Sequence, residues 1–335
     1  MSLRVLVTDY AWPSLDIERG ILSEVGAELV VAQSGLEEEL TSLAPEIDAI
    51  LTCWKPVTAT VLRAAAKCRT VARYGVGLDN IDIRAATELG ILVSNVPDFC
   101  SDEVADHTLA LILAQARQIP AYDRQTSSGG WDNKEFGSMH RLRGRVLGLV
   151  GYGSIARGVA TRALAFGMDV VAFSPSRVGA PADGSVRFAD SLDSLLRQSD
   201  IVSLHLPATP ATDKFIGAEE LAAFKPGACL VNTSRGALID EDALVEALTN
   251  HQLHGAALDV LVTEPPLATH PLRELPTAIL TPHAAFMSEE SVTELQQKAA
   301  RNVTTVLRGG IPETTVNGEV LQSPALRMPL GAARG

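Results

Sequence analysis

Three residues that each follow a short, β-rich apolar run are the first candidates for chemistry: Arg235, Glu264 and His283. A histidine has an unperturbed pKa of roughly 6.5, so His283 can donate or accept a proton near neutral pH. Glu264 can stabilise the protonated ring, and the planar guanidinium of Arg235 can bind a carboxylate or a carbonyl. Reduction of a 2-oxo acid by hydride transfer needs a proton donor and a polarising cation. Taken singly, each of the three could instead be an ordinary surface residue at the start of a loop.

A glycine-rich turn is the strongest motif in the chain. The apolar run Val146–Val150 leads directly into Gly151 and Gly153, and a helix is expected to start at Ser154. Gly151 permits a tight turn, and Gly153 has no side chain to keep a pyrophosphate away from the backbone. The N–H groups of Ser154 and Ile155 at the helix start are suited to bind phosphate. The pattern predicts a dinucleotide site, with a purely structural turn as the alternative.

The residues after the next apolar run, Asp169–Phe173, bear on the choice of cofactor. A dinucleotide-binding fold usually carries Asp or Glu here to bind the ribose hydroxyls, but this chain has Ser174. Without the carboxylate a 2′-phosphate is not repelled, and Ser176 and Arg177 can bind one. The segment favours NADP(H) over NAD(H). If Arg177 is only a solvated loop residue, the cofactor is NAD(H).

Short apolar runs alternate with helical stretches along the whole chain. The expected strands are Arg4–Thr8, Glu28–Ala32, Ala49–Thr52, Thr70–Arg73, Leu92–Ser94, Val146–Val150, Asp169–Phe173, Ile201–Leu206, Ala228–Asn232, Gly255–Asp259 and Ala278–Thr281. This alternation predicts an α/β protein with parallel sheets and right-handed crossovers. Ligands of such sheets bind at the carboxyl ends of the strands, where the candidate residues stand.

Two long helices and two irregular segments are also expected. Asp102–Arg117 should be a buried helix capped by Ser101, and Ser288–Leu307 should be a second helix that Ser288 caps itself. The stretch 120–145 shows no strong periodicity, which predicts an irregular segment of the kind that serves function or an interface. The tail after Asn317 is rich in Pro and Gly and is expected to fray.

Composition narrows the function classes. A chain of 335 residues that is 46% hydrophobic suits two folded domains, and its net charge of −12 opposes binding to nucleic acid or anionic membranes. No signal peptide and no spanning apolar run is recognisable. The four cysteines show no metal-ligand spacing, and a cytoplasmic protein with reduced, mostly buried thiols is expected: Cys53, Cys68, Cys100 and Cys229. A metal or disulfide role is the weaker alternative, and no metal-ligand cluster is found.

The motifs, in their order, resemble the D-2-hydroxyacid dehydrogenase family. They are the glycine turn, Ser234-Arg-Gly, Leu258-Asp-Val with Glu264-Pro, and Thr281-Pro-His. The family includes glyoxylate/hydroxypyruvate reductases, phosphoglycerate dehydrogenases and the C-terminal binding protein corepressors, and the resemblance extends from about residue 45 to 317. It implies two Rossmann-like or flavodoxin-like parallel-sheet domains with a central cleft. Residues 1–97 with 286–335 would bind substrate, and residues 98–285 would bind NAD(P).

The resemblance also implies roles for individual residues. Arg235, Glu264 and His283 would form the catalytic set, with His283 as the acid/base. Cofactor contacts would come from Gly151, Gly153, Ser154, Ile155, Ser174, Arg177, Leu206, Pro207, Thr233 and Asp259, the last two near the nicotinamide carboxamide. The substrate would lie on Arg235 and on the loop of Tyr74, Val76 and Gly77, where free amides form an anion-binding nest.

Other expectations concern assembly and the two remaining histidines of interest. The resemblance implies a homodimer formed through the helix 102–117 and the segment after it, and Trp131 is a candidate to reach the partner's substrate pocket. His107 is expected to be a satisfied core or interface histidine. His205 is expected to be structural.

The expected activity is that of an NAD(P)-dependent oxidoreductase acting on a CH–OH group, with glyoxylate, hydroxypyruvate or a similar 2-oxo acid as substrate. An alternative from another class is an NAD(H)-sensing, corepressor-like binding protein, although long disordered flanks are lacking. A formate or phosphite dehydrogenase is a further alternative, and Glu264 argues against formate. The short tail after Asn317 favours a simple reductase over a feedback-regulated enzyme.

Overall fold

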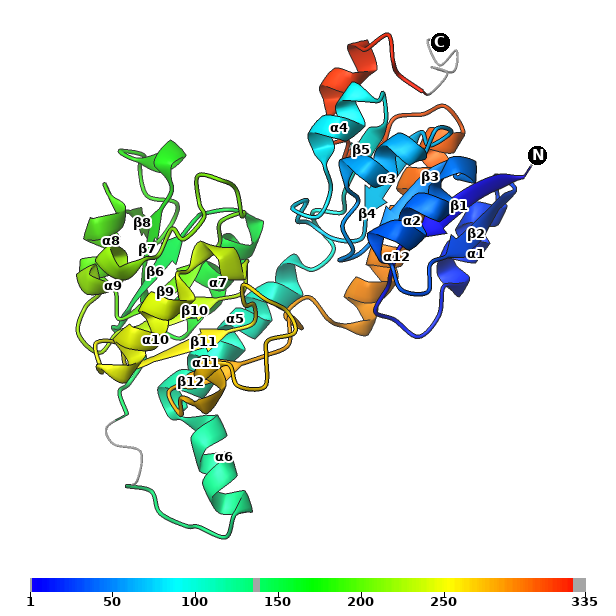
Figure 1. The fold of residues 1–335 in the computed structure, drawn as a ribbon. Coiled ribbons are helices and arrows are strands. Elements are labelled where there is room, and N and C mark those ends of the chain that lie inside the picture. The colour runs from blue at the N-terminus through cyan, green and yellow to red at the C-terminus, as the bar shows by residue number, and fades with distance from the viewer. Residues whose placement is uncertain (1, 135–138, 328–335) are drawn as a thin grey trace. The chain divides into compact units, whose positions relative to one another are not determined.

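The computed structural model describes residues 2–134 and 139–327, which fold into two compact units. Unit 1 comprises Met1–Cys100 and Ser288–Gly335, and unit 2 comprises Ser101–Met287. Each unit is built around one parallel sheet covered by helices, so the expected α/β fold class is confirmed (Figure 1). The sequence analysis places the boundaries between the two domains after residues 97 and 285, a few residues before these unit boundaries.

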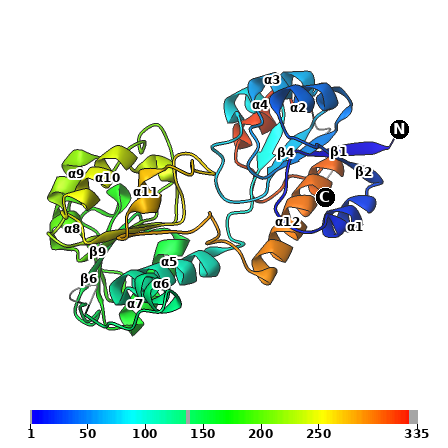
Figure 2. The same ribbon diagram turned by 60° about the horizontal axis from the view of Figure 1, so that its bottom comes forward.

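Unit 1 has five strands in the order β2-β1-β3-β4-β5 among the described residues. The strands are β1 (Leu3–Val7), β2 (Ala27–Val31), β3 (Ala49–Thr52), β4 (Thr70–Arg73) and β5 (Leu92–Ser94). The helices are α1 (Asp16–Ser23), α2 (Glu37–Leu43), α3 (Ala59–Ala64), α4 (Ile83–Glu88) and α12 (Glu289–Leu307). Helices α1 and α12 cover one face of the sheet, and α2, α3 and α4 cover the other (Figure 2). The central strands are buried on both sides, which explains their continuous apolar runs.

Unit 2 has seven strands in the order β12-β11-β10-β9-β6-β7-β8 in the part described. The strands are β6 (Val146–Val150), β7 (Asp169–Phe173), β8 (Val186–Phe188), β9 (Ile201–Leu204), β10 (Cys229–Asn232), β11 (Gly255–Leu258) and β12 (Ala278–Leu280). The helices are α5 (Ser101–Arg117), α6 (Ile119–Ser127), α7 (Ser154–Ala165), α8 (Leu192–Gln198), α9 (Ala218–Ala223), α10 (Glu241–Thr249) and α11 (Pro271–Glu274).

Two apolar clusters hold the sheet of unit 2 between its helices. Helices α8, α9 and α10 pack on one face through residues such as Leu195, Leu221 and Leu244. Helices α5 and α7 pack on the other face through residues such as Leu109 and Val159. Figure 2 shows these two groups on opposite sides of the sheet. The strand order reverses between β6 and β9, which is where ligands of a doubly wound sheet bind.

The structure corrects three local expectations in unit 2. The first part of the segment 120–145 is not irregular, because Ile119–Ser127 form helix α6. The short strand β8 (Val186–Phe188) was not expected at all. Ser101 is the first residue of α5 rather than its cap, and its hydroxyl lies 3.4 Å from that of Ser154.

The tail after Asn317 does not fray over its described part. A 3₁₀ turn spans Gly318–Gln322, the amide of Arg327 donates to the carbonyl of Gly90, and the Arg327 guanidinium donates to the carbonyl of Ala65. Side chains of Val320 and Leu326 pack beside the β5 residue Leu92. The rest of the expected fraying falls on residues 328–335, which lie outside the described residues.

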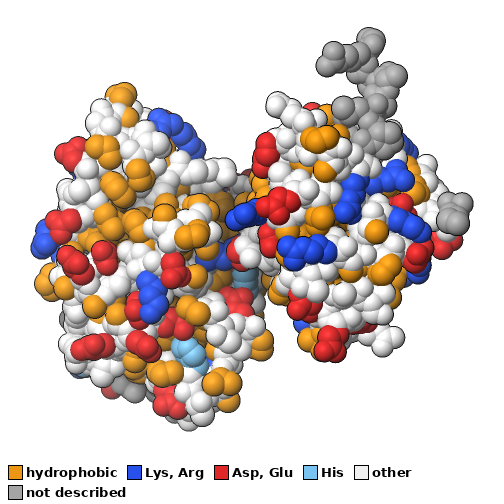
Figure 3. Space-filling view, turned by 45° about the horizontal axis from the view of Figure 1, so that its top comes forward, with side chains coloured by type: hydrophobic (Ala, Val, Ile, Leu, Met, Phe, Trp, Pro, Cys, Tyr) orange, Lys and Arg blue, Asp and Glu red, His pale blue; other side chains and the backbone are white. Residues whose placement is uncertain are grey.

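The surface and the cysteines agree with the composition. On the face shown in Figure 3, Lys and Arg side chains are dispersed among Asp and Glu. Among the described residues, no helix combines the length and the apolar character needed to cross a membrane. All four cysteines are free thiols, and Cys53, Cys68 and Cys100 are buried.

Candidate active site

The glycine turn joins β6 to α7 and presents the start of a twelve-residue helix. Gly151 has φ +96°, and a Cβ on it would lie 2.3 Å from the carbonyl oxygen of His205, so a side chain is excluded. A Cβ on Gly153 would meet nothing within 4 Å, which leaves open space in front of the helix. Within the described residues no side chain caps the first turn of α7, so its amides are available to a phosphate. These features fit the pyrophosphate of a dinucleotide.

The residues expected at the ribose end lie together after β7. Ser174 precedes a 3₁₀ turn at Pro175–Arg177, and its hydroxyl lies 3.1 Å from that of Ser176. The Arg177 guanidinium lies 5.8 Å from the ring centre of Phe188 in the unexpected strand β8. Strand β8 therefore gives Arg177 an aromatic surface to rest on. Leu206 and Pro207 lie in the loop after β9. The side chain of Leu206 lies close to Gly151.

Arg235 lies in the loop that follows β10, and two side chains brace this loop. The side-chain Nδ2 of Asn232 donates to the Arg235 carbonyl at 2.8 Å, and the Ser234 hydroxyl donates to the carbonyl of Leu204 at 2.8 Å. A Cβ on Gly236 would lie 2.0 Å from the carbonyl carbon of Leu261. Only glycine fits there, so the loop of Arg235 is pressed against the loop that carries Glu264.

Glu264 and His283 form a direct pair. Nδ1 of His283 lies 2.7 Å from Oε2 of Glu264, and the amide of Leu261 donates to Oε1 at 2.9 Å. An ionised carboxylate only accepts hydrogen bonds, so Nδ1 carries a proton and Nε2 is left for another partner. The pair therefore fixes both the orientation of the imidazole and its tautomer.

The charges at this site act on one another. Burial raises the pKa of Glu264, but the hydrogen bond and charge of His283, the amide of Leu261 and the charge of Arg235 together lower it by more. The net pKa is below its ordinary value, so the carboxylate is ionised at neutral pH. The structure thus joins the imidazole and the carboxylate directly, and the charge of Arg235 is close enough to act on the carboxylate.

The two residues expected near the nicotinamide carboxamide have partners within the protein. Asp259 is 1% exposed, and its carboxylate accepts from the amides of Ala284 and Ala285, each at 2.9 Å, and from the hydroxyl of Thr281. The hydroxyl of Thr233 lies 2.9 Å from that of Thr108 in α5. Asp259 and Thr281 hold the turn of His283, a role that the sequence analysis missed because it needs contacts between separate strand ends.

The expected substrate loop lies in unit 1, after β4. Tyr74 is 2% exposed and its hydroxyl donates to Glu18, so its side chain supports the loop from inside. Gly75 adopts φ +137° and its carbonyl accepts from Val96. In the described part of the chain the amides of Val76 and Gly77 donate to no protein acceptor. They remain available to an anion.

The described residues contain no group of three or more His, Cys, Asp or Glu side chains arranged to hold a metal ion. His205 lies at the end of β9 with Nε2 2.9 Å from the hydroxyl of Ser203, and burial lowers its pKa to about 4.

Comparison with known proteins agrees with this arrangement. The family model for the D-isomer specific 2-hydroxyacid dehydrogenase NAD-binding domain matches residues 109–285. The chain is 38% identical over 286 residues to a glyoxylate reductase of Thermococcus litoralis, covering 83% of this chain and 86% of that one. It is 40% identical over 317 residues to a D-3-phosphoglycerate dehydrogenase of Methanocaldococcus jannaschii, covering 94% of this chain and 59% of that one. The chain therefore spans little more than half the length of such phosphoglycerate dehydrogenases.

A solved structure with a bound cofactor is also similar. It is an NADPH-dependent glyoxylate/hydroxypyruvate reductase of Sinorhizobium meliloti in complex with NADP and malonate. It aligns with a TM-score of 0.82 and 27% identity over 98% of both chains. The sequence motifs, the fold and these similarities have one common explanation: the chain belongs to the D-2-hydroxyacid dehydrogenase family, and residues 109–285 form its NAD-binding domain.

Proposed function

We propose that this protein is an NAD(P)-dependent reductase of small 2-oxo acids, with glyoxylate and hydroxypyruvate as the first candidates. The observation that carries the proposal is the 2.7 Å hydrogen bond between Nδ1 of His283 and Oε2 of Glu264, beside the charge of Arg235. The three side chains follow β10, β11 and β12, on the same sheet as the phosphate-binding start of α7. Relatives named glyoxylate reductase support the substrate class.

Each side chain has one task in the proposed reaction. The guanidinium of Arg235 binds the substrate and polarises its carbonyl. The dihydronicotinamide, when bound, supplies the hydride to the carbonyl carbon. His283 donates its Nε2 proton to the oxygen that becomes the hydroxyl, and Glu264 stabilises the imidazolium before that transfer. In the reverse direction neutral His283 accepts the hydroxyl proton at the same nitrogen.

Unit 1 is proposed to bind the substrate carboxylate. The free amides of Val76 and Gly77 form the nest, and the buried side chain of Tyr74 keeps the loop in place. A local positive potential of this kind is needed because the net charge of the chain is −12.

A panel of 2-oxo acids assayed with NADPH and with NADH tests the activity. Glyoxylate and hydroxypyruvate should be reduced, seen as loss of the dihydronicotinamide absorbance. A phosphorylated hydroxypyruvate belongs in the panel because of the phosphoglycerate dehydrogenase relatives. Binding of the cofactor without turnover of any member would contradict the proposal and favour a cofactor-sensing binding protein.

Removal of the imidazole tests the proton donor. His283→Ala should lower kcat by about 100-fold or more, which is the scale of lost general acid catalysis. His254→Ala is the matched control, because His254 is exposed and precedes β11 at the opposite, amino end of its strand. Steady-state kinetics of both variants are the measurement, and an unchanged kcat in His283→Ala would remove His283 from the mechanism.

The cofactor is proposed to be NADP(H), with Ser174, Ser176 and Arg177 around the 2′-phosphate. Ser174→Asp should shift the ratio of kcat/KM toward NADH, because a carboxylate binds the ribose hydroxyls and repels the phosphate. Ser174→Asn is the control for size without charge and should keep the NADPH preference. Wild-type preference for NADH, or no shift in Ser174→Asp, would place the ribose contact elsewhere.

A homodimer is the proposed assembly. Helix α6 has no buried residue along its described length, Ile119 is 57% exposed, and Trp131 in the following segment is 92% exposed. Exposed apolar side chains of this size are typical of surfaces that another chain covers. Light scattering should give the mass of two chains for the wild type, and Ile119→Asp should give one. A monomeric wild type would end the proposal.

The cytoplasm is the proposed compartment, and neither nucleic acid nor a membrane is a proposed partner. Free thiols persist in reducing compartments. The excess of 40 acidic over 28 basic residues disfavours polyanionic partners.

A further inference from the structure

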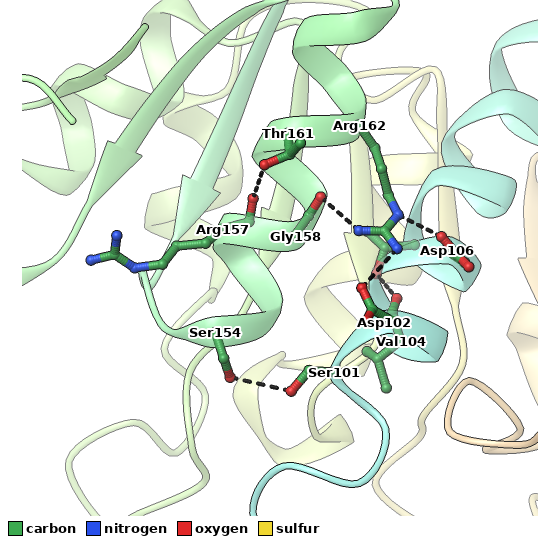
Figure 4. Close-up of polar contacts among 10 residues, drawn as sticks. Ser101, Asp102, Val104, Asp106, Ser154, Arg157, Gly158, Thr161 and Arg162 are labelled. Carbon is green, nitrogen blue, oxygen red and sulfur yellow. Dashed lines mark hydrogen bonds and ion pairs between the residues drawn. The ribbon is translucent and has the colours of Figure 1, made fainter. Parts of the chain in front are cut away.

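Helix α5 contacts several segments of the candidate active site of unit 2: the start of α7 and the residues that follow β10, β11 and β12. At its start, Asp102 and Asp106 bind the guanidinium of Arg162 in α7, and the Ser101 hydroxyl faces that of Ser154 (Figure 4). About two turns after Ser101, α5 carries the neighbouring residues His107 and Thr108. Thr108 contacts the Thr233 hydroxyl after β10, and His107 points to the strand end that precedes His283.

The turn that carries His283 is strained and needs support. His283 has φ +53°, in the left-handed region that only a few per cent of non-glycine residues adopt. Its amide donates to the carbonyls of Asp259 and Thr281 at 2.8 and 3.0 Å. The carboxylate of Asp259 accepts hydrogen bonds from the amides of Ala284 and Ala285, the two residues that follow His283. The position of the imidazole therefore depends on where Asp259 and Thr281 are held.

His107 completes this arrangement from α5. Its Nε2 lies 3.0 Å from the hydroxyl of Thr281 and 3.5 Å from Oδ1 of Asp259. The hydroxyl of Thr281 has one proton and donates it to Asp259, so it can only accept from His107. Nε2 of His107 must then carry a hydrogen. The imidazole is a donor aimed at the oxygen atoms that anchor the turn.

We infer that His107 is a positioning residue for His283, acting through Thr281 and Asp259. His107 does not touch the reacting atoms, and it sets the geometry of the residue that transfers the proton. The inference rests on the proposed function of His283. A misplacement of about 1 Å at a reacting group can lower a rate by about 100-fold, so a contact of this kind matters for catalysis.

The test compares His107→Ala with His107→Gln, because the glutamine amide can place a donor where Nε2 stands. His107→Ala should lower kcat by about 10-fold or more with KM for the 2-oxo acid and for NADPH nearly unchanged, and His107→Gln should restore most of kcat. In a Thr281→Val background, His107→Ala should add little further loss, because its partner is already gone. The exposed His254→Ala serves as the histidine control. Unchanged kcat in His107→Ala, no rescue by glutamine, or fully additive losses would overturn the inference.

A second measurement is independent of turnover. Amide hydrogen exchange of the peptide around Ala284 and Ala285 should be faster in His107→Ala than in the wild type and near normal in His107→Gln. If the wild type reduces no 2-oxo acid, the proposed function fails, yet this exchange still tests whether His107 holds the turn. Equal exchange in all three proteins would overturn the inference by itself.

Discussion

His205, at the end of a strand, both packs against the glycine turn and makes the stability of the protein depend on pH. Its carbonyl oxygen leaves no room for a side chain on Gly151, and its Nε2 pairs with the hydroxyl of Ser203. Burial lowers its pKa to about 4, because the charged ring would lose its hydration there. The histidine is therefore neutral in the native protein at neutral pH.

The sign of the resulting pH effect follows from proton counting. Between pH 6.5, the unperturbed value, and about 4, the unfolded chain binds a proton at His205 and the native chain does not. The unfolding free energy is therefore unaffected by protonation of His205 above pH 6.5. It decreases as the pH falls from 6.5 to about 4, because protonation of His205 then favours the unfolded chain. From pH 7 to pH 5 the wild type should lose up to about 2 kcal/mol more unfolding free energy than His205→Gln, which does not titrate.

Urea unfolding followed by circular dichroism at the two pH values measures this difference. Glutamine can keep the hydrogen bond to Ser203, so it isolates the titration from the contact. Equal losses in the two proteins would show that His205 titrates normally in the native state.

At the scale of elements, the contact between α5 and α7 depends on the absence of one side chain. A Cβ on Gly158 in α7 would lie 3.0 Å from the Cβ of Ala105 in α5. The same two helices are joined at their surface by Arg162 with Asp102 and Asp106 (Figure 4). The close approach keeps α5 beside the first turns of α7, whose start is the proposed phosphate site.

Gly158→Ala should destabilise unit 2 by about 1 kcal/mol, since overpacking outweighs the gain in helix propensity. Gly20→Ala is the matched control, because Gly20 lies within α1 and a Cβ there meets nothing within 4 Å. It should stabilise the protein by about 0.5–1 kcal/mol. Thermal unfolding of both variants is the measurement, and a stabilised Gly158→Ala would show that α5 and α7 can separate without cost.

At the scale of the whole molecule, unit 1 is assembled from both ends of the chain. Asn317 is 1% exposed; its Oδ1 accepts from the amide of Val93 at 2.8 Å, and its Nδ2 donates to Thr87 and Ile91, each at 2.9 Å. These bonds hold the C-terminal segment against β5. Asn317 and Val320, which follow α12 in the chain, are thus buried in unit 1.

Asn317→Ala should lower the stability of unit 1 by about 3 kcal/mol, because it leaves buried donors and acceptors without partners. Glu319→Ala in the same segment is exposed and should stay within about 0.5 kcal/mol of the wild type. Tryptophan fluorescence reports on this unit, because Trp12 and Trp54 both belong to it and Trp131 is already exposed. A Glu319→Ala loss as large as that of Asn317→Ala would refute the specific role of the amide.

The sequence was sufficient for the elements that bury a full apolar face. Strands β3 and β4 and helix α12 appear where their patterns placed them, because burial selects those patterns directly. Helix α6 was missed because it buries no residue in this chain and so carries no apolar stripe. Strand β8 was missed because its three residues, Val186, Arg187 and Phe188, are too few to show a clear strand periodicity.

For the site, the sequence by itself determined the residue types and their order: the glycine turn, Arg235, Glu264 and His283. Only the tertiary structure decided which of them meet. The Glu264–His283 hydrogen bond, the loop contact that Gly236 permits, and the support of Asp259 by His107 join residues from different strand ends and from α5. The physical reason is that local sequence encodes periodicity and turn chemistry, whereas hydrogen bonds between segments depend on how parallel strands align their carboxyl ends.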